Sequence, residues 1–153
     1  MKGEPPREAM GAAALVGAWR LVQWTLEYPA SGRITQPFGL GAQGLLVYTA
    51  DGHVSAVLQA PARPAFATAD LREVEDSEKA AAFGSYLHYA GRWRIEAGCV
   101  IHDVEFSMNP NLQGTRQVRG ATLGGDVLTL TAEESLDAGP ARRHRLLWRR
   151  ASP

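Results

Sequence analysis

Two acids, an amide and an arginine fall on neighbouring strand-like segments, where they could do acid-base chemistry together. Asp103 and Glu105 alternate along one segment, and Gln117 and Arg119 alternate along the next. Residues two apart share one face of a strand. A carboxylate can move a proton while an arginine stabilises developing negative charge. We therefore take Glu105 and Asp103 as candidate proton-transfer groups and Arg119 as their candidate electrostatic partner.

A predicted turn through residues 96–98 sets the register of this hairpin. With Gly98 in the left-handed position, residues 89, 91, 93 and 95 pair with 105, 103, 101 and 99. This face carries Trp93 and Ile101, so we expect it to point inward, together with Asp103 and Glu105. The Tyr89 hydroxyl would join them. Buried charges persist only when they are paired or used, so a structural salt bridge is the other interpretation of this cluster.

The opposite face of the hairpin is an alternative lining of the interior. It carries His88, Arg92 and His102. If this face points inward, a histidine base becomes the leading catalytic candidate, because histidine titrates near neutral pH.

Several aromatic and polar side chains are expected to contact a ligand. Aromatic groups with a polar tip suit an apolar pocket that must orient its ligand. The expected ligand contacts are Tyr48, Tyr89, Trp93, His102 and Gln117.

Metal and cofactor sites are not expected. The four histidines are scattered without paired metal-ligand spacing, and no glycine-rich phosphate motif precedes a helix. Cys99, the single cysteine, cannot form an internal disulfide. A reducing, cytoplasmic location fits this best.

The elements that must position these residues are short and β-rich. Between turn signals, the sequence predicts strands at 17–27, 34–38, 44–49, 53–59, 87–96, 99–107, 115–123, 126–132 and 142–150, and one short helix at 76–83. Asp51-Gly52 is a strong hairpin turn that pairs Tyr48 with Val54, and Gly124-Gly125 is a second turn. The fold class is all-β, a single antiparallel up-and-down barrel of eight to nine strands.

The bulk composition limits the partners. The 153 residues suit one domain, which we place at 14–153 after a flexible leader at 1–13. Sixteen basic residues balance sixteen acidic ones, so no positive field favours nucleic acid. The N-terminus lacks the order of a secretory signal, and no apolar run could span a membrane. The expected partner is a small hydrophobic ligand or substrate, and a homodimer is left open.

Motifs along the chain resemble the bacterial and fungal lipocalin-like domain family, of the calycin type. Gly17-Ala18-Trp19 is similar to the lipocalin Gly-x-Trp signature, and the segments at 44–52, 89–93, 102–105 and 109–119 follow in the family's order and spacing. The resemblance covers about residues 16–149. It implies that Trp19 plugs the closed end of the barrel, with Arg149 or Arg150 over its ring, and we assign this role to Arg149.

The resemblance implies a binding cavity more than a reaction. We therefore expect the protein to bind a small, largely apolar molecule inside the barrel, without a cofactor. The alternative is a cofactor-independent cyclase or isomerase that acts on a polyketide-like natural-product intermediate in the same cavity, since some small barrels of related shape do this.

Overall fold

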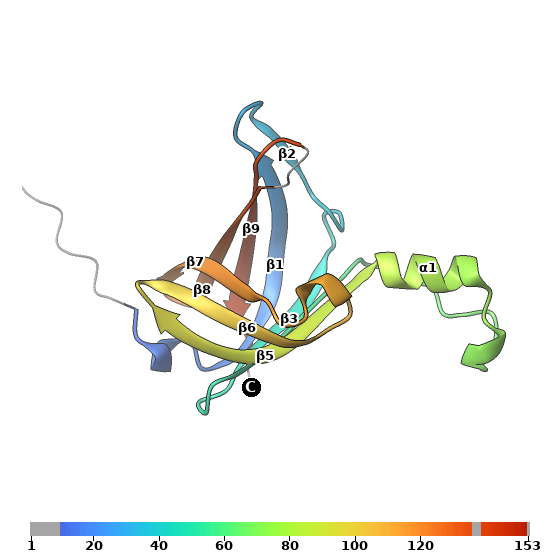
Figure 1. Ribbon diagram of the computed structural model, residues 1–153, viewed down its shortest axis with the longest axis horizontal. Coiled ribbons are helices and arrows are strands. Elements are labelled where there is room, and N and C mark those ends of the chain that lie inside the picture. Colours follow the sequence, from blue (N-terminus) through green and yellow to red (C-terminus); the bar gives the residue numbers. More distant parts are fainter. Residues whose placement is uncertain (1–9, 136–138, 153) are drawn as a thin grey trace, which may run out of the picture.

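Nine strands and one α-helix make up the structure, a computed structural model that describes residues 10–135 and 139–152 (Figure 1). The strands are β1 (Gly17–Tyr28), β2 (Arg33–Thr35), β3 (Gln43–Tyr48), β4 (His53–Gln59), β5 (Tyr86–Glu96), β6 (Cys99–Ser107), β7 (Arg116–Gly124), β8 (Val127–Glu134) and β9 (Arg142–Arg150). The helix α1 spans Asp76–Gly84, and short 3-10 helices span η1 (Ala12–Ala14), η2 (Leu71–Glu73) and η3 (Pro110–Leu112).

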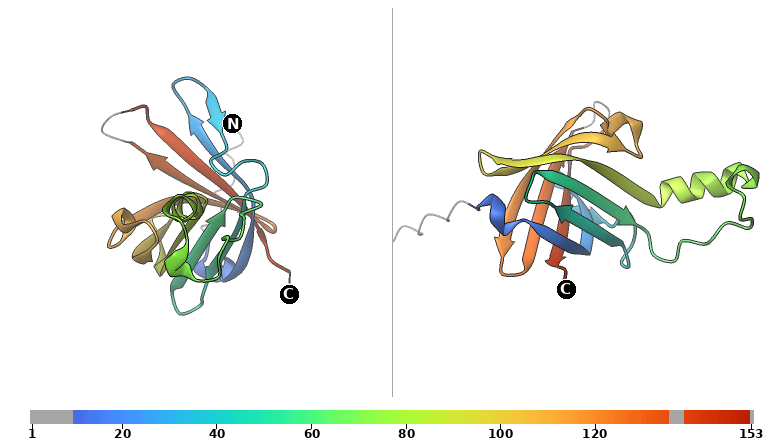
Figure 2. Two further views of the ribbon diagram at one scale, coloured as in Figure 1. Left: turned by 90° about the vertical axis from the view of Figure 1, so that its right-hand side faces the viewer. Right: turned by 90° about the horizontal axis from the view of Figure 1, so that it is seen from below.

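The sheet closes on itself as an antiparallel barrel. Its order is β2-β1-β3-β4-β5-β6-β7-β8-β9, and β1 also pairs with β9, so the predicted all-β barrel is confirmed. Closure removes the unpaired edges that invite aggregation. The extra strand β2 pairs only with the far end of β1, from Leu26 to Tyr28. The helix α1 projects away from the barrel (Figures 1 and 2), and no described helix is long and apolar enough to cross a membrane.

Side-chain alternation directs one set of residues into the barrel. The Asp51-Gly52 turn pairs Tyr48 with Val54, as the sequence predicts, and both side chains are buried. A bulge in β1 at Val22 breaks the alternation there. As a result Trp19 and Trp24, five residues apart, are both buried, while Val22 is exposed.

The register of the β5–β6 hairpin differs from the prediction by one residue. Glu96 pairs with Cys99 and Trp93 pairs with His102, because the turn contains only two residues, Ala97 and Gly98. Both have positive φ, 51° and 77°, as a tight hairpin turn requires. A shift of one residue turns every β6 side chain to the other face, so the predicted pairing was wrong for β6.

A bulge further along β6 inserts one extra residue. Gly91 pairs with Val104 and Ala90 pairs with Phe106, which leaves Glu105 without a partner on β5. Val104 is buried, while Glu105 and Phe106 are exposed.

The β7–β8 turn lies one residue later than predicted. Gly124 pairs with Val127, so the loop residues are Gly125 and Asp126 rather than Gly124 and Gly125. The predicted shared face survives this correction, because the pairing moves by two residues, which places Leu130 opposite Ala121 on the same face.

Trp19 is fully buried, and its ring is covered by Arg150 rather than by the predicted Arg149. The Arg150 guanidinium carbon lies 4.2 Å from the Trp19 ring centroid. Its nitrogens donate to the carbonyls of Val16 (3.1 Å) and Ala14 (2.6 Å). Arg149 points outward, because it neighbours the buried Trp148 on a strand of alternating faces. Of the predicted leader at 1–13, residues 1–9 lie outside the described residues.

Replacing Arg150 with alanine is expected to destabilise the protein by about 2 kcal/mol. The change removes a cation–π contact of ~0.5–2 kcal/mol and two hydrogen bonds of ~0.5 kcal/mol each, since one is part-buried and the other exposed. Arg149→Ala is the matched control and should change stability by less than about 0.5 kcal/mol, as surface substitutions do. Urea unfolding of both variants measures the difference, and equal midpoints would contradict the assignment of Arg150.

Candidate functional site

A histidine held between two tyrosine hydroxyls lies inside the barrel. Tyr48 ends β3, Tyr89 lies on β5 and His102 lies on β6, and all three side chains are buried. The Tyr48 hydroxyl is 2.7 Å from Nε2 of His102, and the Tyr89 hydroxyl is 2.5 Å from Nδ1. Trp93 packs on Tyr48 with ring centroids 4.6 Å apart. Three strands thus converge on one fully hydrogen-bonded imidazole.

Burial controls the charge states of this group. Burial lowers the pKa of His102 to about 3; the positive charge of Arg119 adds to this effect and Asp103 opposes it. Burial also raises the pKa of Tyr48 and that of Tyr89, and Arg119 partly opposes both shifts. All three groups are therefore neutral at physiological pH, and the imidazole cannot act as a strong base there.

Gln117 and Arg119 on β7 complete the polar group. His102 pairs with Gln117 and Val100 pairs with Arg119, so both β7 side chains lie on the inner face. The Gln117 amide nitrogen donates to the Thr115 hydroxyl at 2.8 Å. Both β7 side chains are only half-buried. Part of each side chain therefore contacts solvent.

The hydrogen-bonded pairing of β7 with β8 stops short of these two residues. The ladder between β7 and β8 runs from Gly124 and Val127 to Gly120 and Thr131. Gln117 and Arg119 lie beyond its end. Polar side chains at the edge of an apolar interior, beside a gap in the ladder, have the form expected of a ligand entrance.

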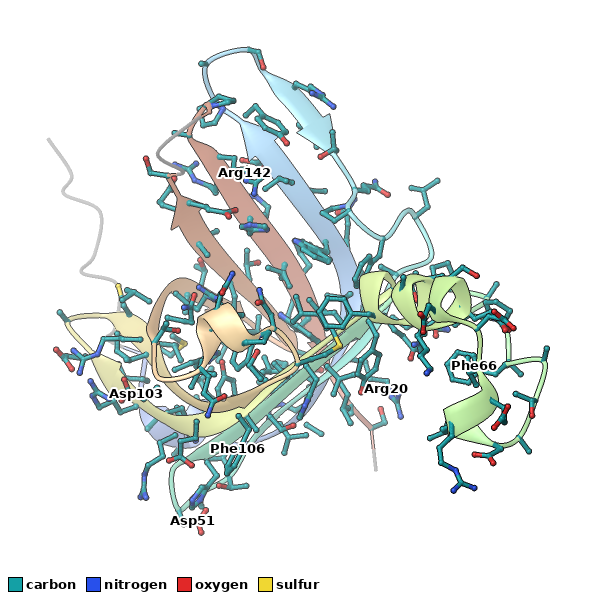
Figure 3. The ribbon with its side chains drawn as sticks, turned by 45° about the vertical axis from the view of Figure 1, so that its right-hand side comes forward. Arg20, Asp51, Phe66, Asp103, Phe106 and Arg142 are labelled. Carbon is teal, nitrogen blue, oxygen red and sulfur yellow. The ribbon has the colours of Figure 1, made fainter. Side chains whose placement is uncertain are left out.

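A second polar network faces inward farther along β1, β8 and β9. The Trp24 indole donates to Nδ1 of His144 (3.2 Å), and Nε2 of His144 lies 2.7 Å from Glu134. Arg142 donates to both oxygens of Glu134, at 2.8 and 3.0 Å. These contacts lower the pKa of the Glu134 carboxyl, with the Arg142 hydrogen bond as the main cause. The negative charge of Glu134 is thus paired with Arg142 inside this network. Figure 3 shows Arg142 well away from Asp103.

Comparison with known proteins agrees with this architecture. A family model described as a lipocalin-like domain matches residues 16–151. The chain belongs to the lipocalin-like domain family. It is also similar to the 4'-hydroxy-3'-methoxypropiophenone carrier protein of Aspergillus oryzae, with 33% identity over 106 residues that cover 63% of this chain and 96% of the relative. No solved structure gives a significant match.

The lipocalin-like barrel places the two predicted acids on its outside. Asp103 pairs with Arg94 and with Arg116, which lower the pKa of its carboxyl, and Figure 3 shows it at the outer side of the barrel. Glu105 and Phe106 line a shallow outer hollow of about 260 Å³. The expected inward cluster of Asp103 and Glu105 with Arg119 therefore does not form, because the two-residue turn shifts β6 by one position.

The other predicted site residues come together inside the lipocalin-like barrel. Tyr48, Tyr89 and Trp93 keep the predicted face of their strands, and His102 joins them instead of the acids. The interior is thus lined by the predicted inward face of β5 and by the face of β6 that was the alternative. Trp24 and His144 were not singled out as neighbours, since the β1 bulge that turns Trp24 inward leaves no plain sequence signal.

Proposed function

We propose that the protein binds and carries a small, largely apolar aromatic molecule inside its barrel. The proposal rests above all on one observation: half-buried Arg119 and Gln117 face inward beside the end of the β7–β8 ladder. Both contact solvent beside an interior whose core is built mainly of apolar and aromatic side chains. Pockets of this composition bind small molecules and orient them through a few polar groups.

The aromatic character of the ligand is supported by the interior and by the relative. Trp93 and Tyr48 form a tilted aromatic pair, and Trp24 meets Phe38 edge-on at 5.0 Å. Such side chains favour stacked or edge-on contact with another ring. The similar protein of Aspergillus oryzae is a carrier of a propiophenone, which is a ketone attached to an aromatic ring. A carrier role also suits His102, which is neutral and already fully hydrogen-bonded.

Tryptophan fluorescence tests this function directly. Titration with 4'-hydroxy-3'-methoxypropiophenone should quench the emission with one-to-one stoichiometry, and the ligand should be recovered unchanged. Ala121→Phe places a ring on the inner face of β7 and should weaken binding at least tenfold. Thr122→Phe, on the outer face of the same strand, is the matched control and should bind as the native protein does.

Two results would contradict the carrier proposal. Equal binding by the Ala121 and Thr122 variants would place the ligand outside the barrel. Conversion of the ligand to a product would favour the cyclase or isomerase alternative.

A further inference from the structure

The buried group of Tyr48, Tyr89 and His102 has one more donor proton than its internal hydrogen bonds use. Two tyrosine hydroxyls and one neutral imidazole hold three exchangeable protons. Their two mutual hydrogen bonds use two of these protons, whichever tautomer His102 adopts. One hydroxyl proton, on Tyr48 or Tyr89, is left to donate to an acceptor outside the group. A buried donor without an acceptor destabilises the folded protein.

Arg119 adds further unused donors at the same place. Its guanidinium has five N–H groups and no acceptor. Its guanidinium reaches Oε1 of Gln117 at 3.4 and 3.5 Å, which is long for an N–H···O bond, and it also interacts with the Tyr89 hydroxyl. Since the Gln117 amide nitrogen also donates, the cluster supplies many donors and few acceptors.

The positive charge of Arg119 also has no counter-charge among the described residues. Among the described residues, no carboxylate lies within ion-pair distance of its guanidinium. Asp103, one strand away, faces outward to its own arginines. Inward-facing Glu134 is held by Arg142 and His144. The groups that face Arg119 from β3, β5 and β6 are the neutral Tyr48, Tyr89 and His102.

Elsewhere in the interior, a buried donor also lacks an acceptor. Within the part of the chain that the structure describes, one buried side-chain nitrogen or oxygen has no hydrogen-bond partner, and it is the donor Nε1 of Trp148. Trp148 lies on β9 between the inward-facing Leu128 and Leu21. The interior therefore favours a ligand that brings acceptors over one that brings donors.

We infer that the interior site binds its ligand through a negatively charged acceptor oxygen, the ionised hydroxyl of an acidic phenol, which Arg119 and one tyrosine hydroxyl hold. This inference rests on the proposed function and narrows its ligand class. A phenolate supplies the missing acceptor and the missing negative charge together. A hydrocarbon supplies neither, and an amine would add a donor and a positive charge. Burial alone disfavours ionisation of a phenol, whereas a facing guanidinium favours it.

The ionisation state of a bound phenol provides the test. The ultraviolet absorbance of 4'-hydroxy-3'-methoxypropiophenone changes when its phenol ionises, so the pKa of the ligand is measurable free and bound. We expect bound ligand to have a phenol pKa at least about one unit below that of free ligand, which is a tenfold shift in its ionisation equilibrium. The non-ionisable 3',4'-dimethoxypropiophenone should bind at least tenfold more weakly.

Variants on the two faces of β7 assign the effect to Arg119. Arg119→Met should abolish the lowered phenol pKa, and Arg119→Lys, which keeps the charge, should retain part of it. Arg116→Gln, on the outer face beside Asp103, should leave it unchanged.

The outcomes separate this inference from the proposed function. A bound phenol pKa equal to or above the free value, with binding intact, would overturn the inference and leave the carrier proposal standing. A lowered pKa that survives in Arg119→Met would overturn the assignment to Arg119. Failure of both ketones to bind would reject the proposed function, and the inference with it.

Discussion

Gly91→Ala is expected to destabilise the protein by about 3 kcal/mol, because the β6 bulge passes directly over this glycine. A Cβ at Gly91 would lie 2.0 Å from the carbonyl oxygen of Asp103 and 2.9 Å from the amide nitrogen of Glu105. Both are backbone atoms, which cannot rotate aside as a flexible side chain can. Forcing atoms into a packed site typically costs about 1–3 kcal/mol, and a backbone clash belongs at the top of that range. Urea unfolding measures the loss.

Gly124→Ala provides the control for a change of the same size. No atom lies within 4 Å of a Cβ at Gly124, and its φ is not positive. Alanine there restricts the unfolded chain and should leave stability unchanged or raise it by up to about 1 kcal/mol. Similar urea midpoints for the two variants would show that the bulge can relax.

The sequence predicted the barrel because its turns and alternation are mostly regular. Asp51-Gly52 between two apolar runs correctly paired Tyr48 with Val54, since a tight turn with a left-handed glycine leaves one register. The predicted strands agree closely with those observed except at 34–38, where β2 covers Arg33–Thr35, and β1 pairs with β9 to close the barrel. The Trp19 of the Gly-x-Trp segment is fully buried, with an arginine of the last strand over its ring.

The site was harder to predict, because it depends on single-residue irregularities. Ala97 has positive φ without being a glycine, which shortens the turn and exchanges Asp103 for His102. Such a conformation is uncommon for alanine and has no sequence signature. The bulge at Glu105 and the one at Val22 also lack a sequence signature, although each changes which of the following side chains on its strand face inward.

The sequence does contain a signal that identifies Arg150 as the arginine over Trp19. It lies two residues after Trp148, and residues two apart share a strand face. Because large aromatic side chains tend to point inward, Trp148 could have identified Arg150 as the arginine above Trp19. The neighbouring Arg149 must then face solvent, as it does. Alternation is thus the stronger guide wherever no bulge intervenes.

Acidification from pH 7 to pH 5 is expected to lower the free energy of unfolding by about 2 kcal/mol through His102 alone. Its pKa is about 3 in the folded protein, against an ordinary value of 6.5. Between these values the unfolded chain binds a proton that the native protein does not, so stability falls as the pH falls. The slope is about 1.4 kcal/mol per pH unit, and the stabilisation is fully present only above about pH 6.5. Urea unfolding across this pH range measures it.

Two variants separate the titration of His102 from simple loss of a contact. Tyr48→Phe removes a hydrogen-bond partner but keeps the buried imidazole, so it should lower stability at every pH and preserve the slope. His102→Phe should lower stability at pH 7, because two tyrosine hydroxyls lose a partner, and should flatten the slope between pH 7 and 5. If His102→Phe does not fold, NMR of the native protein should show a His102 ring that stays neutral down to pH 5. Protonation of that ring near pH 6.5, or equal native stability at pH 7 and pH 5, would show that His102 is hydrated rather than enclosed. The conclusion that one tyrosine hydroxyl of the His102 group has a free donor proton would then no longer hold.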